Sequence, residues 1–267
     1  MKTSTKTVSV LVLVVAGLGG YLYWSQREAA PVEGPAPVEA PVAQAPEPAA
    51  PVPEPAPNYP IPVPDEAEAA GAEVDPDAKL LAALRALFGA SVDTLFNTTD
   101  IVRRIVVTVD NLPRDKVARR LMPVKPVPGP MVVAGSGDAR VLDESNAARY
   151  STYIHLVDTV PTAAVVDAYV RNYPVFQQRY VELGYPEGYF NNRLVEVIDH
   201  LLATPEPAGP LRLAQPKVLY TFADPELEAL SEGRKILLRM GPDNAARVKA
   251  KLREIRAAVT RNAPSKD

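Results

Sequence analysis

Each of the two histidines in the sequence has an acidic residue within helical reach. Glu196 and His200 are four positions apart with Arg193 nearby, and Asp158 follows His155 by three positions. Residues three or four apart are neighbours on a helix, so Glu196 and His200 supply two potential metal ligands. A protein zinc site needs at least three ligands, and the sequence indicates no third. Solvent-exposed helix pairs are therefore the alternative interpretation.

Hydrolytic chemistry has weaker support in the sequence. Glu182, Glu187 and Glu196 are the glutamates that could serve a cell-wall glycan hydrolase or lyase with a single acid-base residue, but none has a paired carboxylate in a recognisable motif. No Gly-x-Ser-x-Gly elbow occurs, and Gly135-Ser136-Gly137 is typical of a hairpin turn. The absence of cysteine excludes thiol catalysis, disulfides and a lipid-bearing cysteine. No cofactor is expected.

Two clusters of cationic residues are better candidates for binding. Each would attract anionic lipid headgroups, acidic glycans or an acidic protein, and the alternative is a solvated, salt-bridged helix face. The first cluster comprises Arg103, Arg104, Arg114, Lys116, Arg119, Arg120 and Lys125. The second comprises Arg234, Lys235, Arg239, Arg247, Lys249, Lys251, Arg253, Arg256 and Arg261, whose charges fall on both flanks of an apolar stripe, which favours the alternative.

Two short motifs complete the predicted partner-binding set. Asp110-Asn111-Leu112-Pro113-Arg114 follows an apolar segment, and its Asp and Asn can bond to local backbone and end a helix. The other interpretation is a rigid loop that presents Arg114 to a partner. Asn191, Asn192 and Arg193 invite the same two interpretations. With these motifs, the predicted partner-binding residues are Arg103, Arg104, Asp110, Asn111, Arg114, Arg119, Arg120, Asn191, Asn192 and Arg193.

An apolar segment near the N-terminus predicts a membrane anchor. Residues 7–26 are twenty uncharged residues, which as a helix reach about 30 Å, the thickness of a bilayer core. Tyr21, Tyr23 and Trp24 suit the far interface, and Lys2 and Lys6 precede the span, so residues 1–6 are expected in the cytoplasm. A cleaved signal peptide is the alternative. The chain is thus predicted to be a single-pass protein of the bacterial inner membrane.

Residues 27–76 predict a disordered tether. Pro31–Pro64 contains 13 prolines in 34 residues, and proline prevents propagation of helix or sheet, which leaves polyproline II. A spacer is the main interpretation. The alternative is a docking strip for a proline-binding groove at Asn58-Tyr59-Pro60-Ile61-Pro62, where the tract has the most side-chain character.

Residues 77–261 predict a periplasmic domain that is mainly α, followed by a disordered tail at 262–267. Asp75-Pro76 opens the first helix, and later helices are expected over 91–97, 99–112, 143–157, 161–183 and 187–202 and from 225 and 242. A strand is the alternative at 101–112, which is rich in β-branched residues. Pro174 predicts a kink or break. Residues 131–134 and 139–142 predict a hairpin, and 218–221 a short strand.

Four stretches of this domain resemble the bacterial family named domain of unknown function 3014. They are residues 103–114 (RRIVVTVDNLPR), 146–150 (NAARY), 189–202 (YFNNRLVEVIDHLL) and 241–249 (GPDNAARVK). The resemblance extends over about residues 79–260. It implies a membrane-tethered envelope protein of Gram-negative bacteria and gives no catalytic residues to carry over.

The charge distribution completes the functional expectation. Residues 1–76 hold three positive and ten negative charges, a net of −7, and the whole chain is −3, which leaves +4 for residues 77–267. This balance does not indicate nucleic-acid binding. We expect a non-enzymatic binding or scaffolding module, with an anionic envelope component or an acidic protein as its partner. The alternative is the glycan hydrolase or lyase.

Overall fold

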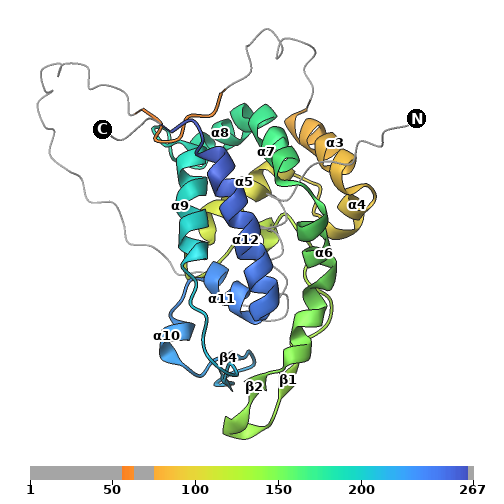
Figure 1. The fold of residues 1–267 in the computed structure, drawn as a ribbon, viewed down its shortest axis with the longest axis vertical. Helices are drawn as coiled ribbons and strands as arrows, with labels where there is room; N and C mark the ends of the chain where they lie inside the picture. The colour runs from red at the N-terminus through yellow and green to blue at the C-terminus, as the bar shows by residue number, and fades with distance from the viewer. Residues whose placement is uncertain (1–55, 63–74, 264–267) are drawn as a thin grey trace, which may run out of the picture.

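The computed structural model describes residues 56–62 and 75–263. These residues form a mainly helical domain with small antiparallel hairpins (Figure 1), which confirms the predicted helical class of this part of the chain. The α-helices are α3 (Pro76–Phe88), α4 (Ser91–Leu95), α5 (Ile101–Asn111), α6 (Ser151–Thr159), α7 (Thr162–Arg171), α8 (Tyr173–Glu182), α9 (Phe190–Leu202), α10 (Pro225–Glu228), α11 (Glu232–Arg239) and α12 (Pro242–Val259). The 3-10 helices are η1 (Arg119–Leu121), η2 (Gly137–Ala139) and η3 (Glu144–Tyr150), and the strands are β1 (Val133–Ala134), β2 (Val141–Leu142), β3 (Leu213–Ala214) and β4 (Thr221–Phe222).

The predicted membrane anchor at residues 7–26 lies outside the described residues, as do 1–6, 27–55, 63–74 and 264–267. Among the helices of residues 56–62 and 75–263, none combines the length and apolar character needed to cross a bilayer. The anchor and its orientation stay predictions.

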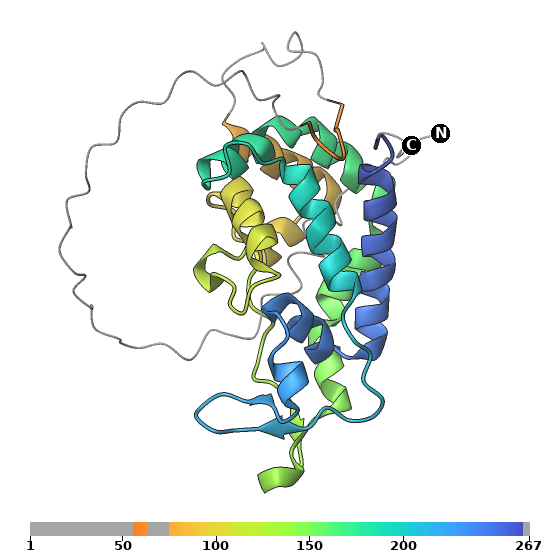
Figure 2. The same cartoon turned by 90° about the vertical axis from the view of Figure 1, so that its left-hand side faces the viewer.

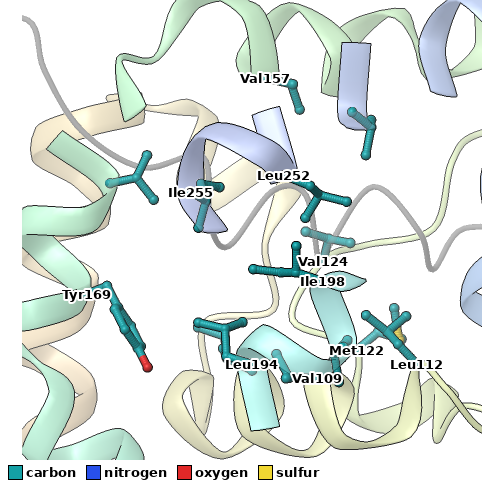
Figure 3. Close-up of a cluster of buried hydrophobic side chains, with 14 of the residues drawn as sticks. Val109, Leu112, Met122, Val124, Val157, Tyr169, Leu194, Ile198, Leu252 and Ile255 are labelled. Atoms are coloured by element: carbon teal, nitrogen blue, oxygen red, sulfur yellow. The ribbon is translucent and has the colours of Figure 1, made fainter. Parts of the chain in front are cut away.

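Helices α9 and α12 form the centre of the core. α9 packs against α5, α8 and α12, while α12 also packs against α6, α7 and α11. Leu194 and Ile198 of α9 and Leu252 and Ile255 of α12 are at most 1% exposed, and Figure 3 shows them gathered in one cluster. Each buried aliphatic side chain of this kind contributes about 1.5–3 kcal/mol, so the helical spacing of apolar residues in both helices sets their orientation.

Helix α5 forms despite its β-branched residues. Ile101, Val102, Ile105 and Val109 are all buried, and their spacing of three and four positions places them on one face of a helix. In a strand, side chains alternate, so Arg103 would share a face with Ile101 and Ile105. Tertiary packing therefore decides the helix over local β preference.

Several predicted helix ends are confirmed and others move. Asp75 caps α3 by accepting from the Asp77 amide, and Pro174 breaks the predicted 161–183 helix into α7 and α8 by occupying the first turn of α8. Asp143 caps η3, which leads into α6. α9 begins at Phe190, not Glu187, because Gln177 of α8 accepts from the Phe190 amide and donates to the Gly188 carbonyl.

Two hairpins lie at one end of the domain (Figure 1). The predicted hairpin is confirmed, with Val133 opposite Leu142 in an antiparallel pair. The second hairpin, β3 with β4, was predicted only as a strand at 218–221, and its strands of two residues carry no detectable alternation. Phe222 of β4 packs in a small apolar cluster with Leu213 and Leu238.

Residues 56–62, which were expected to be spacer, lie against the opposite end of the domain. In Figures 1 and 2 this orange segment runs past the start of α9 and the end of α12. Tyr59 and Ile61 pack against the main core. The spacer prediction rested on proline density, but these two side chains give the segment apolar surface to bury.

Candidate functional site

Asp110, near the end of α5, is the centre of a charged cluster. Its side chain is 4% exposed and accepts hydrogen bonds from Arg114, from Arg193 Nε (3.0 Å) and from the Tyr185 hydroxyl (3.3 Å). Arg193 Nη2 also donates to the Asp110 carbonyl over 2.9 Å. A buried charge is tolerated when it is paired and hydrogen-bonded in this way. Three predicted partner-binding residues are thus brought together.

Tyr185 ties this cluster to the neighbouring aromatic residues. Arg114 Nη2 donates to the Tyr185 hydroxyl over 3.0 Å, and the Tyr185 ring stacks on Tyr180 with centroids 4.6 Å apart. The negative charge of Asp110 raises the pKa of Arg114, and burial is the main cause that raises the pKa of Tyr180 to about 12. Arg114, Arg193 and Tyr185 are the hydrogen-bond donors around the Asp110 carboxylate, and Tyr180 supports them through its ring.

The turn after Asp110 is held by the beginning of α11. The amides of Glu232 and Gly233 donate to the carbonyls of Arg114 and Leu112 over 2.9 and 3.1 Å. These bonds satisfy amides that a helix start leaves without partners. The predicted motif Asp110–Arg114 therefore ends α5, and its carbonyls bind the start of α11. Within the motif, the main-chain carbonyl of Asn111 accepts from the Arg114 amide over 2.9 Å.

The first cationic cluster divides into structural and exposed members. Arg104 donates to the carbonyls of Thr99 and Arg120, which fixes η1 against α5, and Lys125 donates to the Asp93 carbonyl. The side chain of Arg114 is half exposed but is bonded to Asp110. The exposed members are Arg103 of α5, Lys116, and Arg119 and Arg120 of η1. Because η1 packs against α5, the surface that carries these residues is called the α5–η1 face.

Most members of the second cationic cluster form ion pairs within the domain. Arg239 pairs with Glu232 at 2.8 Å with both side chains 7% exposed, and Lys249 pairs with Glu206 at 2.7 Å. Further pairs are Lys235–Glu228, Arg247–Asp158, Lys251–Glu254 and Arg256–Asp199. The salt-bridged alternative holds for these members of the cluster.

Asn191, Asn192 and Arg193 bond to two different parts of the chain. Arg193 binds Asp110, whereas the two asparagines bind the backbone of Tyr59 in the segment 56–62. The three consecutive residues at the start of α9 therefore connect the charged cluster to the docked segment, 133 positions away in sequence.

The candidate catalytic and metal-binding groups do not assemble. His200 hydrogen-bonds Ser231 over 2.7 Å, whereas Glu196 pairs with Arg193. His155 is exposed, and across residues 56–62 and 75–263 no group of three metal-ligating side chains forms. Glu182, Glu187 and Glu196 are exposed, and the hydrogen bond from Arg179 lowers the pKa of Glu182, the opposite of what a general acid requires.

Sequence reasoning missed two contributors, Tyr185 and Tyr169. Tyr169 donates to Asn191 over 3.1 Å inside the core. The role of Tyr185 could not be predicted from local sequence, because its partner Asp110 lies 75 positions away. Sequence analysis gave residues 58–62 as an alternative docking strip because of their side-chain character, but it did not predict that they would lie against the domain of their own chain.

The fold and these contacts define a helical domain that binds a segment of its own chain and holds a buried carboxylate between two arginines. Residues 101–256 match the model of a family described as protein of unknown function (DUF3014). The match covers more than half of the chain, and the chain belongs to this family. No curated protein and no solved structure matches it.

Proposed function

We propose that the chain is a membrane-anchored binding module of the bacterial cell envelope, which holds an anionic partner on the α5–η1 face. Arg103, Lys116 and Arg120 of this face are exposed. The observation that carries the proposal is that Arg104 bonds to the Arg120 carbonyl at 2.5 Å and to the Thr99 carbonyl at 2.6 Å. The half-buried Arg104 thus fixes the backbone of η1 beside α5, where Arg120 is exposed.

The anchor and the partner chemistry extend this proposal. The uncharged span 7–26 and the acidic, proline-rich residues that follow it support a domain held at a distance from the membrane. Exposed cations attract anionic headgroups, acidic glycans or acidic proteins. The exposed positions of Glu182, Glu187 and Glu196 give no specific support to the alternative of a glycan hydrolase or lyase.

Crosslinking in cells tests the proposed face. A photoreactive amino acid replaces exposed Ala118, between Lys116 and η1, and the captured molecule is identified by mass spectrometry. A photoreactive residue in place of Val218, which is 63% exposed in the region of the second hairpin, is the positional control. We expect an anionic molecule from position 118 and not from position 218.

Charge dependence is measured on the same capture. Replacing Arg103, Lys116 and Arg120 by glutamine removes three exposed charges and should weaken capture. Removing three exposed charges elsewhere with K79Q, K217Q and R253Q should not. Raising salt from about 50 mM to about 500 mM shortens the Debye length from about 14 Å to about 4 Å and should weaken capture too. Capture that is indifferent to salt and to the first triple variant would refute an anionic partner.

A further inference from the structure

Two side-chain amides at the start of α9 bind one residue of the segment 56–62 from both sides of its backbone. Asn192 Oδ1 accepts from the Tyr59 amide over 3.1 Å, and Asn191 Nδ2 donates to the Tyr59 carbonyl over 2.8 Å. An extended strand uses the same donor and acceptor to join a sheet edge. The pair of asparagines therefore recognises the main chain of this residue, whatever its side chain.

Asn191 is oriented for this contact by the core. It is fully buried, its Oδ1 accepts from the Tyr169 hydroxyl over 3.1 Å, and its Nδ2 also donates to the Val259 carbonyl over 3.1 Å. Burial raises the pKa of Tyr169 well above its ordinary value, so the hydroxyl keeps its proton and donates. The amide is thereby held with its nitrogen toward Tyr59. The α9 side of the contact is preorganised.

The prolines of the segment restrict its backbone before it docks. Tyr59 and Ile61 each precede a proline, which disfavours helical backbone and favours an extended conformation. Pro57, Pro60 and Pro62 fix their own φ angles, so little conformational entropy remains to be lost on docking. Asn58 is exposed and leaves the contact to its neighbours.

The side chains of Tyr59 and Ile61 add apolar contact. Tyr59 and Ile61 pack against the core. A cavity of about 320 Å³ lies beside them, with Ile61 and Pro62 on one wall and Val166 and Val170 of α7 and Ala258 and Val259 near the end of α12 on the others. The segment thus forms one wall of this cavity, and residues of α7 and α12 in the folded domain form the other walls.

We propose that the groove between α7, the start of α9 and the end of α12 is a binding site for peptides of the type Tyr-Pro-aliphatic-Pro, and that residues 56–62 occupy it as an intramolecular ligand. A partner peptide of this chemistry must displace the segment. Partner binding and release of residues 56–62 from the domain are therefore one event. The peptide site uses other residues than the α5–η1 face, so the peptide-binding proposal and the proposed function can be refuted independently.

The covalent connection favours the intramolecular ligand. Twelve residues, 63–74, separate the segment from Asp75 at the start of α3. A short linker of this kind sets an effective concentration in the millimolar range. A free peptide with the same contacts must therefore exceed this concentration to compete, and the affinity of the groove should be strongly masked in the intact chain.

A peptide-binding experiment tests the site. The full chain in detergent is compared with a full chain in which residues 56–62 are replaced by glycine and serine, and each is titrated with a fluorescent peptide of residues 56–62. We expect the replaced chain to bind the peptide at least about tenfold more tightly than the wild type. No binding to the replaced chain, or equal binding to both, would overturn the proposal.

The recognition of Tyr59 is tested in both molecules. A peptide whose Tyr59 amide is replaced by an ester lacks the donor to Asn192 and should bind about three- to tenfold more weakly, as expected for one lost hydrogen bond. An ester at Asn58 is the matched control and should bind normally. N192A in the replaced chain should give the same loss, with no further loss for the Tyr59 ester. Unchanged binding of the Tyr59 ester overturns the proposed contact even if N192A fails to fold.

Discussion

Arg193 binds Asp110 at both its side chain and its main chain, with Nε 3.0 Å from Oδ1 and Nη2 2.9 Å from the carbonyl oxygen. The two residues lie 83 positions apart and join α5 to α9. The carboxylate is enclosed, whereas Arg114, its other charged partner, has a side chain that is 51% exposed. The energetic weight of the cluster should therefore lie on Asp110 and Arg193.

Removing the Asp110 carboxylate should destabilise the domain strongly. D110A leaves Arg193 and Arg114 without their shared partner, and breaking a buried ion pair in this way costs about 3–5 kcal/mol. R114Q should cost at most about 1 kcal/mol, because the Arg114 side chain is half exposed and Arg193 and Tyr185 still bond to Asp110. Urea denaturation followed by circular dichroism measures both. Equal, small losses would mean that the cluster is not structurally important.

His200 predicts a pH dependence of stability. Burial, together with the charges of Arg234 and Arg193, lowers the pKa of His200 below its usual 6.5. The unfolded chain then binds the proton more readily, so this stabilisation is present above about pH 6.5 and is lost as pH falls through the window below it. Between about pH 7.5 and about pH 5.5, the urea midpoint of H200Q should fall less than that of the wild type. H155Q, at an exposed histidine, should follow the wild type.

Gly233 allows α11 to approach the turn after α5. A Cβ atom there would lie 2.8 Å from the Leu112 carbonyl oxygen and 2.9 Å from Leu201 Cδ2. Because the Gly233 amide also bonds to that carbonyl, the helix cannot move away without losing the bond. G233A should destabilise the domain by about 1–3 kcal/mol, the usual cost of overpacking. A thermal midpoint equal to the wild type would show that the contact relaxes freely.

The elements that sequence analysis located are those with a long apolar period or a proline at a boundary. α5, α9 and α12 follow from their buried stripes, and the break between α7 and α8 from Pro174. The helix predicted from 225 is divided into α10 and α11, and sequence analysis did not predict the new start at Ser231, whose side chain accepts from the Arg234 amide. The strands β3 and β4 are too short to show alternation.

For the site, too, sequence analysis found single residues but not their contacts. Asp110, Arg114 and Arg193 were selected one by one, because each lies near a helix end, but their meeting depends on the packing of α5 against α9. Local sequence could not distinguish Arg104, which bonds to backbone carbonyls, from exposed Arg103. It also could not give the groove that receives Tyr59, because three separate helices build it.

The orientation of the predicted anchor is open to direct test. Lys2 and Lys6 before the uncharged span 7–26 predict a cytoplasmic N-terminus and an external domain. Protease added to spheroplasts should degrade the domain from Asp77 onward without lysis. A cytoplasmic protein serves as the control for intact cells. A domain that is cut only after lysis would contradict the predicted orientation and, with it, the envelope location.

Docking of Tyr59 should also shorten the reach of the predicted tether. If the segment is released, sixteen more residues, 59–74, separate the domain from the membrane side of the chain, which is at most about 50 Å at ~3.1 Å per residue. The chain has no cysteine, so dyes on Q44C and A257C label two defined positions, the second exposed near the end of α12. Energy transfer should fall in N192A and on addition of excess peptide 56–62, whereas N58A should match the wild type. Transfer that stays the same in all three would mean that residues 56–62 do not hold the tether to the domain.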